Sequence, residues 1–137
     1  MAATETTTTD ARSVRPAVPS ALLADAALVT LFAGIGFATH SPDAVSAWGV
    51  AMTAWPFLVA LAVGWVVSVA WRAPLAPLRT GVPVWLVTVG GGMLLRVLLG
   101  QGTALPFVIV ATVTLLVLLV GWRLIAAAVR RARTRAR

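Results

Sequence analysis

Residues 104–122 read ALPFVIVATVTLLVLLVGW, a run of 19 residues that contains no charged side chain. A helix rises ~1.5 Å per residue, so about 20 apolar residues cross the ~30 Å hydrocarbon core of a bilayer. We therefore expect this run to form a membrane-spanning helix. The whole chain agrees, because 137 residues with 60% hydrophobic side chains and a mean hydropathy of +0.96 exceed what a soluble domain of this length can bury.

Three more apolar runs precede this one, and turn-forming residues separate them. His40-Ser41-Pro42-Asp43 and Gly100-Gln101-Gly102 are typical turn sequences, and two prolines mark a loop between the second and third runs. We expect Ser20 to be the N-cap of the first helix. The predicted helices cover about residues 20–39, 47–71, 82–99 and 104–129.

These runs predict an all-α integral membrane protein with a single domain, a four-helix transmembrane antiparallel bundle over residues 20–129. Residues 1–19 are polar and show no periodicity, so we expect a disordered cytoplasmic tail there. Residues 130–137 are rich in arginine and are expected to form a basic cytoplasmic tail. About 110 residues lie between the tails, which leaves no room for a second domain.

Arginine is distributed asymmetrically along the chain, and this distribution predicts the orientation. The net charge is +7, and the chain has no lysine. The turns between the first and second and between the third and fourth helices carry no arginine, and positive charge marks the cytoplasmic side. We therefore expect both termini in the cytoplasm, in a bacterial plasma membrane. The arginines outside the helices are Arg12, Arg15, Arg72, Arg79, Arg130, Arg131, Arg133, Arg135 and Arg137.

The same charges indicate the expected partners. Because they lie at the chain ends and in one loop, they do not predict a nucleic-acid-binding face. The arginines of residues 130–137 can bind anionic lipid headgroups, at ~1 kcal/mol per basic residue near the surface, or can serve only to fix the topology. The expected partners are therefore the lipid bilayer and, in a homo-oligomer, a second copy of the chain.

Small residues recur every four positions in three of the predicted helices. Helices in lipid gain nothing from hydrophobic association, so close backbone approach through small residues favours their packing. We expect these positions to face other helices, although an alanine-rich composition alone would also produce small residues often. The positions are Ala26, Thr30, Gly34 and Ala38; Ala60, Gly64 and Ser68; and Thr88, Gly92, Arg96 and Gly100.

Four ionisable residues fall within or at the ends of the predicted spans: Asp25, His40, Arg96 and Arg123. A charge in hydrocarbon costs at least ~2.5–3.5 kcal/mol, so each needs a partner or a function. Depth along the helices predicts that Asp25 pairs with Arg123 near the cytoplasmic side, and that Arg96 pairs with His40 or Asp43 near the outer side. The residues can hold the bundle together, which we favour, or line a relay or ion path.

Residue types that carry common catalytic and cofactor chemistry are missing. The chain has no cysteine, which excludes disulfides and thiolate metal sites, and no lysine, which excludes a Schiff base. Its single histidine, His40, cannot form a closed zinc site or a bis-histidine haem site within one chain. No metalloprotease, nucleophile-elbow or P-loop motif occurs. We therefore expect no catalytic, cofactor-binding or metal site and a protein that is not an enzyme.

A series of short motifs between residues 20 and 125 resembles one known family. These are Asp25; Gly36 and His40; Trp55-Pro56-Phe57; Gly64-Trp65; Arg72 and Pro74; Thr80-Gly81-Val82 with Val84-Trp85; Gly92-Met93 and Arg96; Phe107-Val108; and Gly121-Trp122-Arg123. In this order they resemble the small prokaryotic membrane proteins of domain of unknown function 3054. The resemblance implies a four-helix membrane protein and assigns no mechanism.

Two functional hypotheses follow from the sequence. We expect a small helical bundle that acts as a homo-oligomer or as an accessory subunit. The alternative is a small transporter or channel in which Asp25 and Arg96 are intramembrane ionisable residues facing a wetted cavity. A membrane enzyme that acts on lipid is a weaker third hypothesis, because the pair of Asp25 and Arg123 has no partner base.

Overall fold

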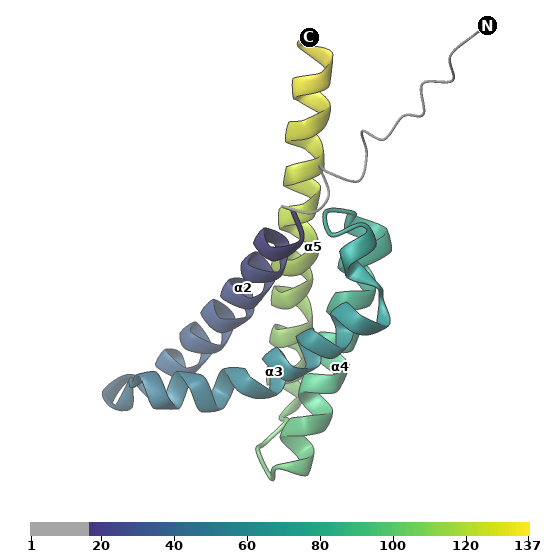
Figure 1. Ribbon diagram of the computed structural model, residues 1–137. Coiled ribbons are helices and arrows are strands. Elements are labelled where there is room, and N and C mark those ends of the chain that lie inside the picture. The colour runs from purple at the N-terminus through teal and green to yellow at the C-terminus, as the bar shows by residue number, and fades with distance from the viewer. Residues whose placement is uncertain (1–16) are drawn as a thin grey trace, which may run out of the picture.

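The structure, a computed structural model, describes residues 17–137. Residues 1–16 of the tail predicted at residues 1–19 therefore lie outside the described residues, and residues 17–19 form the start of a helix rather than part of a disordered tail. Within the described residues the chain forms four long helices and no strand. Four helical segments are long and apolar enough to cross a membrane, the third of them as the continuous segment Pro77–Leu98, which confirms the predicted all-helical class. The helices are α2 (Ala17–His40), α3 (Ala47–Val67), α4 (Val82–Leu98) and α5 (Leu105–Arg135) (Figure 1).

Three short helical segments connect them. A 3-10 turn, η1 (Pro42–Ala44), lies between α2 and α3. A second 3-10 turn, η2 (Ala70–Arg72), and a π-helical segment, η3 (Pro77–Gly81), lie between α3 and α4. The connection that we predicted as a loop over residues 72–81 is therefore partly helical, and η3 leads directly into α4.

The observed start of α2 corrects one sequence prediction. The helix begins at Ala17, so Ser20 lies inside its first turn rather than at the N-cap. There its hydroxyl donates a hydrogen bond to the carbonyl of Ala17 at 3.1 Å. A true serine cap occurs at α3 instead, where the Ser46 side chain accepts a hydrogen bond from the backbone N–H of Gly49 at 3.1 Å.

The end of α3 also differs from the prediction, which placed it at Trp71. The helix ends at Val67, where the Ser68 hydroxyl donates to the Gly64 carbonyl at 2.6 Å and Val69 adopts a left-handed conformation with φ 49°. This conformation ends helices, but glycine or asparagine usually provides it. A β-branched valine at this position gives no sequence signal for a helix end, and the predicted helix was therefore four residues too long.

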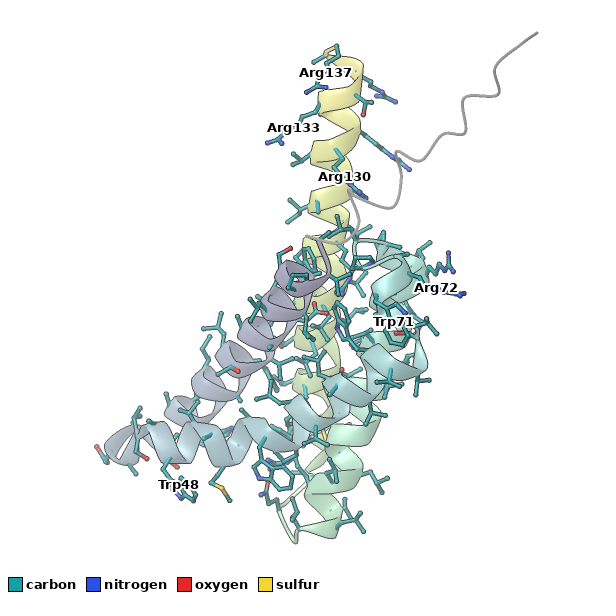
Figure 2. All side chains as sticks on the ribbon, in the orientation of Figure 1. Trp48, Trp71, Arg72, Arg130, Arg133 and Arg137 are labelled. Carbon is teal, nitrogen blue, oxygen red and sulfur yellow. The ribbon has the colours of Figure 1, made fainter. Side chains whose placement is uncertain are left out.

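The α5 helix continues beyond the predicted residue 129 and includes most of the basic tail. Its 31 residues span ~46 Å at the helical rise, well beyond the ~30 Å core of a bilayer. Its last turns extend past the other helices, and Arg130, Arg133 and Arg137 project from this extension (Figure 2). Arginine is a good helix former, which explains why the charged tail continues the helix.

Two ends of the bundle can be defined from this arrangement. The terminal end is where α2 begins and where α5 leaves the bundle, and the loop end carries residues 41–46 and 99–104. Figure 1 shows α2 beside α5 at the terminal end and diverging from it toward the loop end, where α3 begins. In contrast, α4 and α5 run alongside each other, and the Trp85 indole donates to the Thr112 carbonyl at 2.9 Å between them.

Glycines allow α3 and α4 to pack closely, and these two helices share the most extensive contact in the bundle. A Cβ added at Gly92 would lie 2.4 Å from the Phe57 ring, and one added at Gly91 would lie 3.0 Å from Ala60. A Cβ at Gly64 would lie 3.2 Å from the Val84 carbonyl oxygen. The predicted contact through small residues is confirmed for Ala60, Gly64 and Gly92, and it is wrong for Gly100, which is exposed beyond the end of α4.

The small-residue prediction is wrong for part of α2. Thr30 is exposed, and its hydroxyl donates to the Ala26 carbonyl of its own helix at 2.8 Å. The buried stripe lies one position earlier, at Ala21, Asp25, Val29 and Ala33. Both stripes repeat every four residues, so their spacing cannot distinguish them. Asp25 determines which face of α2 points inward, because the hydrogen-bond partners of its carboxylate lie inside the bundle.

We predict that Gly92→Ala lowers stability by about 1–3 kcal/mol, because the added methyl group collides with Phe57, a ring that is fully buried. The measurement is thermal unfolding of the purified protein in detergent. Gly121→Ala is the control, since its Cβ would meet nothing within 4 Å and alanine favours helix by up to ~1 kcal/mol over glycine. A Gly92→Ala variant that melts at or above wild type would show that α3 and α4 are not packed this closely.

Candidate functional site

The terminal end contains a buried ion pair between Asp25 of α2 and Arg123 of α5. Both side chains are fully buried, at 0% exposure. The contact is bidentate, because the two terminal guanidinium nitrogens donate to the two carboxylate oxygens at 2.8 and 2.6 Å. The pairing predicted from depth along the helices is confirmed.

Two tryptophans donate further hydrogen bonds to the Asp25 carboxylate. The Trp65 indole, from α3, donates to Oδ2 at 2.9 Å, and the Trp122 indole, from α5, donates to Oδ1 at 2.8 Å. Each carboxylate oxygen therefore accepts two hydrogen bonds, one from the guanidinium and one from an indole. The sequence analysis identified neither of these contacts, because tryptophan in a membrane protein is explained equally well by packing between helices or by a position at the membrane interface.

The remaining donors of Arg123 bind backbone carbonyls. Its Nε donates to the Pro74 carbonyl at 2.9 Å, and one terminal nitrogen also donates to the Leu119 carbonyl at 2.7 Å. The guanidinium carbon lies 4.7 Å from the centroid of the Trp122 ring. Pro74 belongs to the connection between α3 and α4, so one arginine joins this connection to α2 and α5.

A glycine makes room for the arginine stem. A Cβ at Gly81, just before α4, would lie 3.2 Å from Cδ of Arg123 and 3.5 Å from Val120. The hydrogen bonds of the guanidinium fix this stem, so it has little freedom to move away. The residues that we call the ion-pair cluster are Asp25, Trp65, Pro74, Leu119, Trp122 and Arg123, and together they connect α2, α3, α5 and the segment that leads from α3 to α4.

The loop end contains the second predicted polar residue, Arg96, with partners other than those expected. One terminal nitrogen donates to the Gln101 side-chain oxygen at 3.1 Å, and the other donates to the Gly102 carbonyl at 2.9 Å. Its guanidinium carbon lies 4.5 Å from the centroid of the Phe107 ring. The predicted pairing with His40 or Asp43 is wrong, because the turn that follows α4 offers nearer acceptors only five and six residues away.

His40 nevertheless lies at the same end as Arg96, and the two line a common cavity. This loop-end cavity has a volume of about 320 Å³. Its walls come from α2, α3, the end of α4 and the start of α5, and they are mostly apolar. Its lining residues are Phe32, Ala33, Gly36, Phe37, His40, Thr53, Arg96, Gly102, Ala104 and Phe107.

Aromatic side chains separate the loop-end cavity from the ion-pair cluster. The rings of Phe32, Phe57 and Phe107 pack together with centroids 5.8–6.5 Å apart. Below them, Val29 and Leu115 are fully buried. A relay or ion path between Asp25 and His40 would have to cross this apolar layer, and the described residues show no polar chain through it.

The two threonines available as intermediate carriers do not bridge this gap. The Thr30 hydroxyl donates to its own helix and is exposed outside the bundle. The Thr88 hydroxyl is buried inside and has no hydrogen-bond partner among the described residues. The structure therefore brings Asp25 and Arg123 together, places His40 and Arg96 around a separate cavity, and favours a structural role for the ion pair.

We predict that Asp25→Asn lowers the free energy of unfolding by about 3–5 kcal/mol, because it leaves the buried Arg123 charge unpaired. The asparagine NH₂ group would also face indole and guanidinium donors where the carboxylate now accepts. Thermal unfolding and size-exclusion chromatography in detergent measure the effect. Asp43→Asn, an exposed change of the same chemistry, is the matched control and should leave the melting temperature unchanged.

Comparison with known proteins identifies the family. No curated protein and no solved structure matches the chain. A family model described as a protein of unknown function (DUF3054) matches residues 22–126, which include all four long helices in whole or in large part and every residue of the ion-pair cluster. The protein therefore belongs to the DUF3054 family, and its four helices make it a membrane protein within that family.

Proposed function

We propose that this protein is a non-enzymatic, multi-pass protein of the bacterial plasma membrane that acts as a homo-oligomer or as an accessory subunit of a larger membrane assembly. One observation carries the proposal, namely that the ion-pair cluster is saturated. Both oxygens of Asp25 and all three guanidinium nitrogens of Arg123 are already engaged in hydrogen bonds. A general acid, base or ion ligand needs a free position for its substrate, and this cluster offers none.

The surface of α4 supports association with another protein. Gly90 lies on an exposed face of this helix with Leu86 and Leu94, one turn away on either side. Glycine costs a helix ~1 kcal/mol relative to alanine, and a Cβ at Gly90 would meet nothing within 4 Å, so packing within one chain does not require it. A glycine on a lipid-facing surface lets a helix of another subunit approach closely.

We predict that the purified protein is larger than a monomer and that Gly90→Leu reduces it to a monomer without lowering its melting temperature. The added side chain points away from the bundle and blocks close approach of a second copy. Light scattering coupled to size exclusion in detergent gives the mass. Gly121→Leu is the control, because its added side chain also has open space. A wild-type oligomer that Gly90→Leu leaves intact would exclude this face as the interface.

We also propose the orientation with both termini in the cytoplasm. Arg72 and the arginines of the α5 extension lie toward the terminal end, and Trp48 lies at the opposite side of the bundle (Figure 2). Positive residues favour the cytoplasmic side, and tryptophan favours an interface. Under this orientation the C-terminal arginines meet the anionic lipid headgroups of the inner leaflet, which would stabilise them there.

Single cysteines provide a direct test of this orientation, because the natural chain has none. We predict that Ala44→Cys, exposed at the loop end, reacts with a membrane-impermeant maleimide on intact cells. Ala136→Cys, exposed at the terminal end, should react only after the membrane is permeabilised. The reverse pattern would place both termini outside the cytoplasm.

The second candidate function is a small transporter or channel that uses Asp25 and Arg96. The loop-end cavity favours it, because this cavity brings Arg96 to an open space inside the bundle. Transport would require the aromatic layer and the ion-pair cluster to open. Flux into liposomes that Arg96→Gln abolishes in a protein of unchanged melting temperature would support this function over the first.

A further inference from the structure

The loop-end cavity holds a positive charge that no acidic side chain of residues 17–137 balances. The structure gives Arg96 two hydrogen-bond acceptors, both neutral, from Gln101 and Gly102. Its Nε is buried without a hydrogen-bond partner among the described residues. A guanidinium has five N–H donors, so one N–H on each terminal nitrogen remains for a ligand in addition to the buried Nε. A cation inside a span is costly, which makes an anionic ligand the expected complement.

The guanidinium is held in a fixed position rather than extended freely into solvent. The two acceptors in the 99–104 turn hold its terminal nitrogens, and the Phe107 ring covers it at 4.5 Å. A fixed, planar donor group is suited to bidentate recognition of a phosphate. His40, at the end of α2, lines the same cavity and offers a second polar group.

An apolar groove between α2 and α5 adjoins the loop-end cavity. This groove, of about 390 Å³, shares Phe32, Gly36 and His40 with the loop-end cavity. Its other walls are largely aliphatic, and it lies where α2 diverges from α5 (Figure 1). Its remaining lining residues are Leu31, Ile35, Thr39, Val110, Thr114 and Leu118.

The two spaces together distinguish between possible ligands. A free inorganic anion would satisfy Arg96 but would leave the apolar groove unused. A zwitterionic lipid would bring a cationic group to a cavity whose lining contains no carboxylate. An anionic lipid matches both parts, because its phosphate meets the guanidinium and its acyl chain meets the aliphatic wall.

We propose that one anionic phospholipid binds at the loop end, with its phosphate on Arg96 and an acyl chain in the groove between α2 and α5. The site is separate from the C-terminal arginines, which lie at the other end of the bundle. It also does not depend on the proposed association through Gly90, which lies in α4 and lines neither space. Under the proposed orientation, this lipid comes from the outer leaflet.

Gly36 makes a sharp test possible. It lines both spaces, and a Cβ there would meet nothing within 4 Å, so we expect Gly36→Leu to add a side chain to the binding site. The variant keeps Arg96 and every C-terminal arginine. Gly121→Leu, which adds the same side chain outside both spaces, is its control. A second variant, Arg96→Gln, removes the charge from the proposed site. Its control is Arg79→Gln, which removes the charge of an exposed arginine that precedes α4.

The experiment is native mass spectrometry of the delipidated full-length protein during titration with phosphatidylglycerol, and with phosphatidylcholine of the same acyl chains. We expect one phosphatidylglycerol to bind wild type at least tenfold more tightly than phosphatidylcholine. Gly36→Leu and Arg96→Gln should each weaken this binding at least tenfold, and the two control variants should retain it.

Three results would overturn the proposal. Equal affinity for the two lipids would remove the role of the anionic phosphate. Unchanged binding in Gly36→Leu would place the lipid elsewhere on the protein. Displacement of the lipid by millimolar inorganic phosphate would identify the ligand as a free anion. None of these results depends on the oligomeric state of the protein. Failure of the lipid-binding proposal is therefore distinguishable from failure of the proposed association through Gly90.

Discussion

A carboxylate and a guanidinium, both removed from water, set the arrangement of the bundle. Separately, each charge would be very costly in hydrocarbon. Together they are stable in the geometry observed, in which Asp25 and Arg123 form two parallel hydrogen bonds, each carboxylate oxygen accepts one more from an indole, and Arg123 donates two more to backbone carbonyls. The positions of Trp65 and of the Pro74 carbonyl follow from this requirement. The ion pair therefore orients α2, α3 and the connection to α4 around α5.

The polar contacts divide the molecule into a closed half and an open half. At the terminal end, hydrogen bonds join α2, α3, α5 and the connection between α3 and α4 around Asp25 and Arg123. At the loop end, no comparable contact between helices holds α2 to α5 within residues 17–137, and the helices diverge there around a cavity (Figure 1). The aromatic layer of Phe32, Phe57 and Phe107 forms the boundary. The difference between the closed terminal end and the open loop end thus arises because the ion-pair cluster lies at the terminal end only.

Much of this could be predicted from the sequence, and the failures have physical causes. The number of helices follows from the length of each apolar run, because the thickness of the membrane sets the length of a span. The pairing of Asp25 with Arg123 follows from their similar depth, because a buried charge needs a partner at its own level. Depth alone could not choose among acceptors for Arg96 at the same level, and the nearby Gln101 provided one. Nor could a sequence pattern reveal that Val69 ends α3 in a left-handed conformation, since that position usually requires glycine.

The order of the two charges along the chain has a consequence for biogenesis. Asp25 belongs to the first described helix and Arg123 to the last, 98 residues later. At ~5–20 residues per second, synthesis leaves the carboxylate without its cation for roughly 5–20 s. During this interval Asp25 lacks the cation that balances its charge in the folded protein, so α2 cannot pack in its final position. The bundle can therefore reach its final packing only after α5 has been synthesised, and a chain truncated before Arg123 would keep an unpaired carboxylate at Asp25.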